Sequence, residues 1–448
     1  ECPFDYPLIQ SLIHEHARPM PEIQPFRGWR YDVNQVGLLA DVTAPPYDVI
    51  DAGAQHDLYQ RHPCNVVRLI LNRDEPGDES ESLRYERAAA FLADWQDQGV
   101  LQRDDSPTLS VYHQVFSWEG VEHVRRGFVG RIRLEEFGSG SVFPHEQTMA
   151  GPKADRLALW EHGRTCLSPV FGLYPGDPAA VQQPLEDACR DRSPREVIDP
   201  EGVVHRMWAV NDPEAISAAC AGLAAVPVFI ADGHHRYETA LNYRQGHDEP
   251  AAGFTMMMLV SMDDSGLAIL PTHRLVTGTP GLTSARLASL LESHFSVSQV
   301  GDGPAGARLA WEQISGDGGQ DCLAFGTAAD GCWQLARLRD PRSMDPLAAE
   351  HSTDWRGLGV SRLHRLVLDH LLTREFSEEQ ISCRYAHLLE EVNDSLEGGE
   401  VSLAVLVAPA TLDHVRGIAS SLETMPPKST FFYPKLLSGL VFYPLTGD

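Results

Sequence analysis

The hydrophobic and polar positions of this 448-residue chain follow two periods, and each change of period marks an expected element. Apolar residues at helical spacing predict helices, and alternating or short apolar runs predict strands. Helices are predicted at 85–96, 153–160, 237–244, 360–372 and 411–422. Strands are predicted at 226–231 and 402–407, and hairpins at 109–134, 254–270 and 322–338. Because strands and helices mix without strict alternation, an α+β fold with mixed sheets is favoured over a doubly wound sheet.

The length of the chain predicts two or three domains, since a single core rarely serves so many residues. We expect an N-terminal α/β lobe at 23–174, a central lobe at 201–300 and a C-terminal α+β lobe at 301–448. Residues 175–200 are rich in Pro, Asp and Gln and are expected to connect lobes at the surface. The polar segment before about Glu22 is expected to be peripheral.

The composition narrows the class of partner. A net charge of −27 disfavours nucleic acid and anionic lipid as partners. No run approaches about 18 apolar residues, so no membrane span is expected. The first residues lack the basic and apolar regions of a signal peptide. Eight scattered cysteines without CxxC or zinc spacing are typical of reduced thiols, so a cytoplasmic location is expected.

The strand at 226–231 and the helix at 237–244 enclose the most informative motif, which is formed by Asp232, Gly233, His234, His235 and Arg236. A helix start after a glycine turn presents backbone N–H groups and the positive end of the helix dipole. With two histidines and an arginine added, the place suits an anion, most naturally a phosphate. The alternative is a structural helix start with Asp232 as its cap. Three clustered donors favour the functional interpretation.

A second motif contains His145, Glu146 and Thr148 and precedes Lys153 and Arg156. An imidazole and a carboxylate on one loop could act as orienter and general base, or as ligands for a hard ion. Lys153 and Arg156 lie three residues apart, so on a helix they share a face and could hold an anion together. The alternative is a charged surface loop. The spacing is not HExxH.

A third motif spans residues 425–435, where three prolines, three aromatic residues and two lysines predict a rigid segment laid over the core. Lys428, Ser429, Thr430 and Lys435 could reach a phosphate. A packing segment with solvated lysines is the equally open alternative.

Lesser candidates supply further cations near turns, as a pocket for an anionic ligand requires. Each of them alone is more often structural. They are Arg27, Arg30, Tyr47 with Asp48 after a double proline, and His273 with Arg274. The chain contains no GxxxxGK[ST] loop and no GxSxG elbow, so the common ATPase and serine-hydrolase classes find no support.

Five ordered motifs resemble a widespread prokaryotic family catalogued as domain of unknown function 1015. The resemblance extends from about Ile23 to Tyr443, and that family has no settled activity. The motifs are Pro-Phe-Arg-Gly at 25–28, Ala-Pro-Pro-Tyr-Asp-Val-Ile at 44–50, His-Glu-Gln-Thr at 145–148, Ala-Asp-Gly-His-His-Arg-Tyr-Glu-Thr-Ala at 231–240 and Met-Pro-Pro-Lys-Ser-Thr at 425–430.

The central motif is also similar to the phosphate-binding box of ParB-type CTP switches, sulfiredoxins and free serine kinases. This similarity implies a ParB-like strand-turn-helix unit in which Gly233, His234, His235 and Arg236 contact phosphate. It further implies that Asp232 orients a histidine or a metal. ParB proteins bind DNA, whereas this chain is strongly acidic, and the cysteine of the sulfiredoxin box is missing. The kinase branch is therefore the best analogue.

These observations lead to the hypothesis of a small-molecule phosphotransferase that uses a nucleotide donor, a hydroxylated acceptor and Mg²⁺. Catalytic roles fall on Glu146 as base, His145 as its orienter and Asp232, with Asp232 and Glu146 as metal ligands. The alternatives are a non-catalytic nucleotide sensor and a metal-dependent hydrolase. The acceptor, the nucleotide, the pathway and the oligomeric state are left open.

Overall fold

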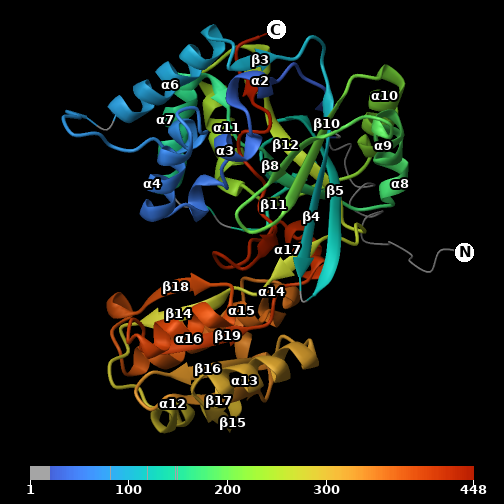
Figure 1. The fold of residues 1–448 in the computed structure, drawn as a ribbon. Helices are drawn as coiled ribbons and strands as arrows, with labels where there is room; N and C mark the ends of the chain where they lie inside the picture. Colours follow the sequence, from blue (N-terminus) through green and yellow to red (C-terminus); the bar gives the residue numbers. More distant parts are fainter. Residues whose placement is uncertain (1–20, 81, 119, 147, 149, 448) are drawn as a thin grey trace, which may run out of the picture. The chain divides into compact units, whose positions relative to one another are not determined.

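The computed structural model describes residues 21–80, 82–118, 120–146, 148 and 150–447. The polar segment predicted to be peripheral falls mainly on residues 1–20, outside the described residues. The described chain forms two compact units. Unit 1 contains its residues up to Pro144, Thr148–Leu267 and the residues from Pro434 on, and unit 2 contains its residues 145–146 and Ala268–Tyr433 (Figure 1).

A mixed sheet forms the core of unit 1, and its nine strands within the described residues confirm the α+β class. Its order is β6-β11-β8-β12-β5-β4-β10-β9, with β1 added beside β5. The predicted hairpin at 109–134 is confirmed as β4 and β5. The strands are β1 Ile23–Gln24, β4 Leu109–Trp118, β5 Val121–Arg133, β6 Val142–Phe143, β8 Val170–Tyr174, β9 Arg195–Ile198, β10 Val204–Val210, β11 Val228–Asp232 and β12 Phe254–Ser261.

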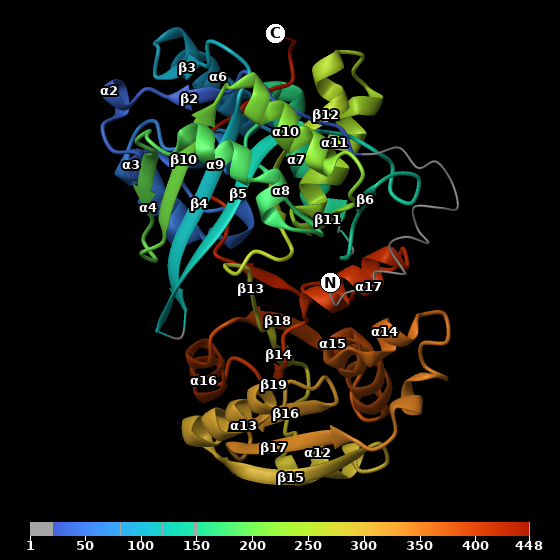
Figure 2. The same cartoon turned by 90° about the vertical axis from the view of Figure 1, so that its right-hand side faces the viewer.

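Helices cover both faces of this sheet. α6 Ser82–Asp97, α7 Ala150–Gly163 and α11 His234–Gln245 lie on one face, with α8 Pro178–Val181, α9 Gln183–Cys189 and α10 Pro213–Leu223 on the other (Figures 1 and 2). Helix α6 buries Tyr85, Ala88, Leu92 and Trp95, a helical spacing that confirms the predicted amphipathic pattern. The predicted helices at 153–160 and 237–244 are likewise confirmed by α7 and α11.

Shorter elements complete unit 1. The double proline keeps the residue before each proline out of the helical conformation, and after Pro46 the chain forms a 3₁₀ turn, Tyr47–Val49. The remaining elements are β2 Trp29–Tyr31, α2 Val33–Val36, α3 Leu39–Val42, α4 Ala52–Arg61, α5 Val67–Ile70, β3 Leu101–Arg103, β7 Thr165–Cys166, the 3₁₀ turn Pro250–Gly253 and β21 Tyr443–Pro444.

Unit 2 contains an antiparallel sheet of six strands within the described residues, in the order β15-β17-β16-β19-β14-β18. A separate two-stranded antiparallel sheet is formed by β13 and β20. The predicted hairpin at 322–338 is confirmed as β16 and β17. The strands are β13 Ala268–Leu270, β14 His273–Thr277, β15 Phe295–Asp302, β16 Cys322–Thr327, β17 Cys332–Leu338, β18 Ser382–Ala386, β19 Leu403–Val407 and β20 Phe431–Tyr433.

The helices of unit 2 include one irregular segment. The helix predicted at 360–372 begins as α15 Gly359–Ser361 and continues as a π-helix, Arg362–Leu371, a geometry that hydrophobic spacing does not encode. The helix predicted at 411–422 is confirmed as α17. The others are α12 Ser284–Leu291, α13 Gly303–Asp317, the 3₁₀ turn Pro341–Met344, α14 Thr353–Gly357, the 3₁₀ turns Leu372–Arg374 and Glu378–Gln380, α16 Leu389–Glu397 and α17 Leu412–Ser420.

Three expectations about connections differ from the structure. The hairpin predicted at 254–270 does not form, because β12 is buried along its whole length between β5 and β8 while β13 pairs with β20. Residues 175–200 do not connect lobes and instead form α8, α9 and β9 within unit 1. The lobe predicted at 201–300 is divided, because β10, β11 and β12 join the sheet of the lobe predicted at 23–174 whereas the residues from Ala268 on belong to unit 2. The chain thus has two units where three lobes were predicted.

None of the described helices combines the length and the hydropathy that a membrane span needs.

The stability of unit 2 is expected to fall as the pH drops below 6.5, because His273 is buried in the neutral form. Burial lowers the pKa of His273 from 6.5 to about 3, and the nearby charges of His387 and Arg274 act in the same direction. His273 therefore binds a proton in the unfolded chain that it does not bind in the folded chain between about pH 3 and 6.5. Stability should be lost at about 1.4 kcal/mol per pH unit there. Urea unfolding of His273→Gln at several pH values should show a dependence of stability on pH that is weaker by about 1.4 kcal/mol per pH unit. An unchanged dependence would show that His273 is not buried in the neutral form.

Candidate functional site

The turn between β11 and α11 depends on glycine. Gly233 has a φ of +89° and forms the N-cap of α11, with no side-chain cap. A Cβ atom at this position would lie 2.9 Å from the guanidinium group of Arg236. The left-handed conformation and this close approach both require glycine. Asp232 is therefore not the helix cap, and its carboxylate is engaged elsewhere.

Asp232 binds two cations, one on each carboxylate oxygen. Arg236 Nη2 donates to Oδ2 at 2.6 Å, and Lys435 Nζ donates to Oδ1 at 2.9 Å. Arg236 also donates through Nη1 to the carbonyl of Pro169. The Arg236 side chain is 9% exposed, that of Lys435 15% and that of Asp232 21%. We call these three residues the triad; its net positive charge lies at the positive end of the α11 dipole, where an additional anion is stabilised.

His234 and His235 occupy the first two positions of α11. His234 is buried and His235 is half-buried. Their predicted contacts with phosphate stay a prediction.

Tyr47 lies in the electrostatic field of the triad. Its ring stacks on the guanidinium group of Arg156, 3.9 Å from the ring centre. Burial raises the pKa of Tyr47, Arg156 opposes this rise, and the charges of Arg236 and Asp232 contribute smaller effects of opposite sign. The lesser candidate Tyr47 therefore belongs with the triad and with Arg156 in unit 1.

Lys153 and Arg156 lie on α7 as predicted, but their head groups bind different partners. Lys153 Nζ donates to Glu238 Oε2 at 2.6 Å, and Thr148 donates to the other oxygen of Glu238 at 2.8 Å. Arg156 Nε donates to Asp155 at 2.9 Å, and Nη1 donates to the carbonyl of Ile70 at 2.5 Å. Lys153 and Arg156 were predicted to hold one anion together. In the structure each of them forms its own ion pair with a carboxylate of the protein.

The second and third motifs come together in unit 2. Glu146 Oε1 accepts the backbone N–H of Lys428 at 2.9 Å, and His145 Nε2 lies 2.8 Å from the hydroxyl of Thr430. His145 is fully buried, and Ser429 donates to the carbonyl of Pro426. Both side chains of the His145–Glu146 pair hold the 425–430 segment. Gln147 lies outside the described residues.

The lesser candidate Arg274 also holds this segment. It is buried and donates to the carbonyls of Lys428 at 3.0 Å and Pro427 at 3.2 Å. Lys428 has a φ of +56°, which is unusual for a residue with a side chain. The bonds from Glu146 and Arg274 fix this backbone conformation from both sides.

The first pair of lesser candidates has a packing role. Arg30 is buried and donates to Asp104 at 2.9 Å and to Ser110 at 2.7 Å, while Arg27 donates to the carbonyl of Asp104.

The predicted site residues therefore fall into two groups. Unit 1 contains Lys153, Arg156, Asp232, Gly233, His234, His235 and Arg236. Unit 2 contains His145, Glu146, Lys428, Ser429 and Thr430.

The predicted magnesium ligands do not fit a metal ion as they are arranged. Both oxygens of Asp232 accept from cations, and an oxygen of Glu146 accepts a backbone N–H. Mg²⁺ requires carboxylate oxygens directed at the ion. In the part of the chain that the structure describes, no three His, Cys, Asp or Glu side chains are grouped as metal ligands.

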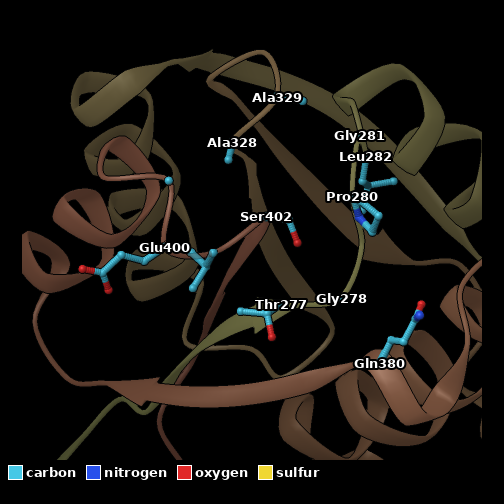
Figure 3. Close-up of a pocket in the computed structure, with 12 residues that line it drawn as sticks. Thr277, Gly278, Pro280, Gly281, Leu282, Ala328, Ala329, Gln380, Glu400 and Ser402 are labelled. Atoms are coloured by element: carbon cyan, nitrogen blue, oxygen red, sulfur yellow. The ribbon is translucent and has the colours of Figure 1, made fainter.

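A cavity of about 700 Å³ in unit 2 lies among loops at one end of the sheet (Figure 3). Its hydroxyl groups are paired, because Thr277 bonds Ser382 at 2.7 Å and Ser402 bonds Thr279 at 2.6 Å. The charged residue on its wall is Glu400, and no predicted site residue lines it. This composition does not suit a phosphate.

Comparison with known proteins places the chain in a family. The family model described as a protein of unknown function, DUF1015, matches residues 23–361, and the chain belongs to that family. A search of curated proteins found no match.

Similar solved structures include a free serine kinase in complex with AMP, at 14% identity and a TM-score of 0.32, covering 65% of this chain and 83% of that one. A conserved hypothetical protein from Pyrococcus furiosus has 13% identity and a TM-score of 0.32, covering 65% and 87%. SbnI with a C-terminal truncation from Staphylococcus aureus has 11% identity and a TM-score of 0.33, covering 68% and 84%. At these values the likeness carries no conclusion about activity.

Proposed function

We propose that unit 1 binds the phosphate groups of a nucleotide at the start of α11 and transfers a phosphoryl group to a hydroxylated small molecule. The observation that supports this proposal is the triad, in which Arg236 and Lys435 share the carboxylate of Asp232. A phosphate that approaches the triad meets two cations that share one carboxylate and keep a net positive charge, at a helix N-terminus. Phosphate oxygens can then exchange with Asp232 as acceptors for Arg236 and Lys435.

The chemistry matches what phosphoryl transfer requires, namely positioning and neutralisation of the charge on the transferred group. Arg236 offers a planar guanidinium group that can bind two phosphate oxygens at once. His234 and His235 are proposed as further donors to phosphate. Once phosphate oxygens have replaced Asp232 as acceptors for the two cations, its carboxylate lies next to the reacting group. Mg²⁺ stays a prediction from the sequence and enters no step of this proposal.

A phosphorus NMR screen of the full chain tests the proposal. ATP, ADP and CTP are each incubated with pooled hydroxylated metabolites, and the spectrum reports turnover, donor and product class together. We expect loss of one donor and a new phosphomonoester signal. Stoichiometric binding without turnover would instead support the nucleotide sensor. The absence of both binding and turnover would overturn the phosphate site itself.

The general-base role that the sequence predicts for Glu146 has its own test. Glu146→Gln keeps an oxygen that can accept the N–H of Lys428, so the fold of unit 2 should be retained. Glu146 lies in unit 2, where its carboxylate holds the 425–430 segment, so Glu146→Gln should leave turnover and nucleotide affinity unchanged. A general base would lose about 100-fold or more of its turnover on this change. Glu146→Ala serves as the structural comparison and should lower stability by about 1–3 kcal/mol. Full turnover by Glu146→Gln would remove Glu146 from the chemistry.

A further inference from the structure

Lys435 lies in a segment whose backbone is held by buried side chains of the unit 1 sheet. Residues 434–437 form neither helix nor strand, so their carbonyl groups need other donors. Arg125 Nη2 donates to the carbonyl of Pro434, and Gln114 Nε2 donates to the carbonyl of Lys435 at 2.9 Å. Two consecutive carbonyls are thereby fixed just before and at the lysine.

The two holding side chains form one unit across the β4–β5 hairpin. Gln114 of β4 is the direct register partner of Arg125 of β5, and Arg125 Nε donates to Gln114 Oε1 at 3.0 Å. Both residues are fully buried. Burying a guanidinium group and an amide costs free energy unless their hydrogen bonds are satisfied. The bonds between the two side chains and to the carbonyls of Pro434 and Lys435 offset this cost.

The Gln114–Arg125 pair is linked to the triad through Phe171. The guanidinium group of Arg125 stacks on the ring of Phe171, 4.7 Å from its centre, and Phe171 of β8 is the register partner of Asp232. Lys435, held through its carbonyl, extends its ammonium group to Asp232 Oδ1. Arg236 occupies the other oxygen from the helix side. The two cations therefore reach Asp232 from different parts of the chain, with independent supports.

We infer that Lys435 is a phosphate-binding residue of the unit 1 site and that Gln114 and Arg125 are its positioning residues. This inference rests on the proposed function. The buried Gln114–Arg125 pair satisfies two carbonyls and at the same time fixes the backbone from which the Lys435 side chain extends. Such a fixed backbone suits a lysine that binds a phosphate in one geometry, because less entropy is lost on binding when the backbone is already held.

The test measures the dissociation constants of ATP and of inorganic pyrophosphate by calorimetry on the full chain. Lys435→Met removes the cation and should weaken both ligands about 10- to 100-fold, and Lys435→Arg should restore most of the affinity. Gln114→Glu keeps an acceptor for Arg125 but loses the donor to the carbonyl of Lys435. It should weaken both ligands at least about 5-fold. Thermal unfolding is measured on every variant.

Gln182→Glu is the matched control for the glutamine. Gln182 is also buried in unit 1 and donates to a backbone carbonyl, that of Gly127, at 3.2 Å. Its replacement should leave both dissociation constants unchanged.

The outcomes separate the two proposals. If Arg236→Ala leaves both ligands bound as before, the proposed function fails. If Arg236→Ala weakens them but Lys435→Met lowers only the melting temperature, the triad binds phosphate without Lys435 and the present inference is overturned. If Lys435→Met weakens the binding of both ligands and a folded Gln114→Glu does not, the positioning role is overturned. A Gln114→Glu protein that fails to fold leaves Lys435→Met and its arginine rescue to decide.

Discussion

Replacement of Arg236 by alanine is expected to weaken nucleotide binding about 100-fold. Arg236 is the helix-borne cation of the triad, and its side chain is only 9% exposed. Charge-assisted hydrogen bonds in such a place contribute about 1.5–3 kcal/mol, which corresponds to about 10- to 100-fold in affinity. The upper end applies because the guanidinium group can bind two phosphate oxygens. Calorimetric titration with ATP measures the change.

Arg244 provides the matched control on the same helix. Like Arg236, it donates to one backbone carbonyl, that of Leu134 at 2.7 Å, and to one carboxylate, that of Glu136 at 2.6 Å. Arg244→Ala therefore removes the same kinds of bond at the other end of α11. It should reduce stability modestly and leave the affinity for ATP as it is. Equal losses of affinity in the two variants would show that the effect of Arg236 is structural.

Replacement of Gly233 by alanine is expected to damage both the fold of the site and its binding of nucleotide. Alanine at a φ of +89° costs about 1–2 kcal/mol for the left-handed conformation. The new Cβ would also lie 2.9 Å from the guanidinium group of Arg236, which is held by Asp232 and the carbonyl of Pro169. Displacing that group sacrifices these bonds, so the total loss should be about 2–4 kcal/mol. Urea unfolding and ATP titration measure the two effects.

Gly246 at the C-terminus of α11 offers the corresponding control. Its φ is −99°, and the nearest atom to an added Cβ is 3.9 Å away. Gly246→Ala should change stability by no more than about 1 kcal/mol, in either direction, and should not affect ATP binding. If Gly233→Ala proves as mild as Gly246→Ala, the close packing of Arg236 on the turn is not needed for the site.

Local pattern accounts for the parts of the fold that sequence analysis predicted correctly. The strand, turn and helix around residues 232–236 follow from an apolar run, a glycine and helical spacing. The β4–β5 and β16–β17 hairpins follow from alternation around short turns. The failed hairpin at 254–270 had the same local signals. Its first strand is buried on both faces in the middle of a sheet, where it pairs with β5 and β8.

The sequence by itself predicted the α+β class of the chain, the helix start after Gly233 and the presence of Arg236 at it. Only the tertiary structure decided which partners meet there. Lys435 reaches Asp232 across 203 residues, and the Gln114–Arg125 pair that holds it is a feature of strand register. The His145–Glu146 pair instead supports the 425–430 segment in unit 2. The periods of helices and strands act over a few residues, whereas contacts between distant segments depend on how the sheets are assembled.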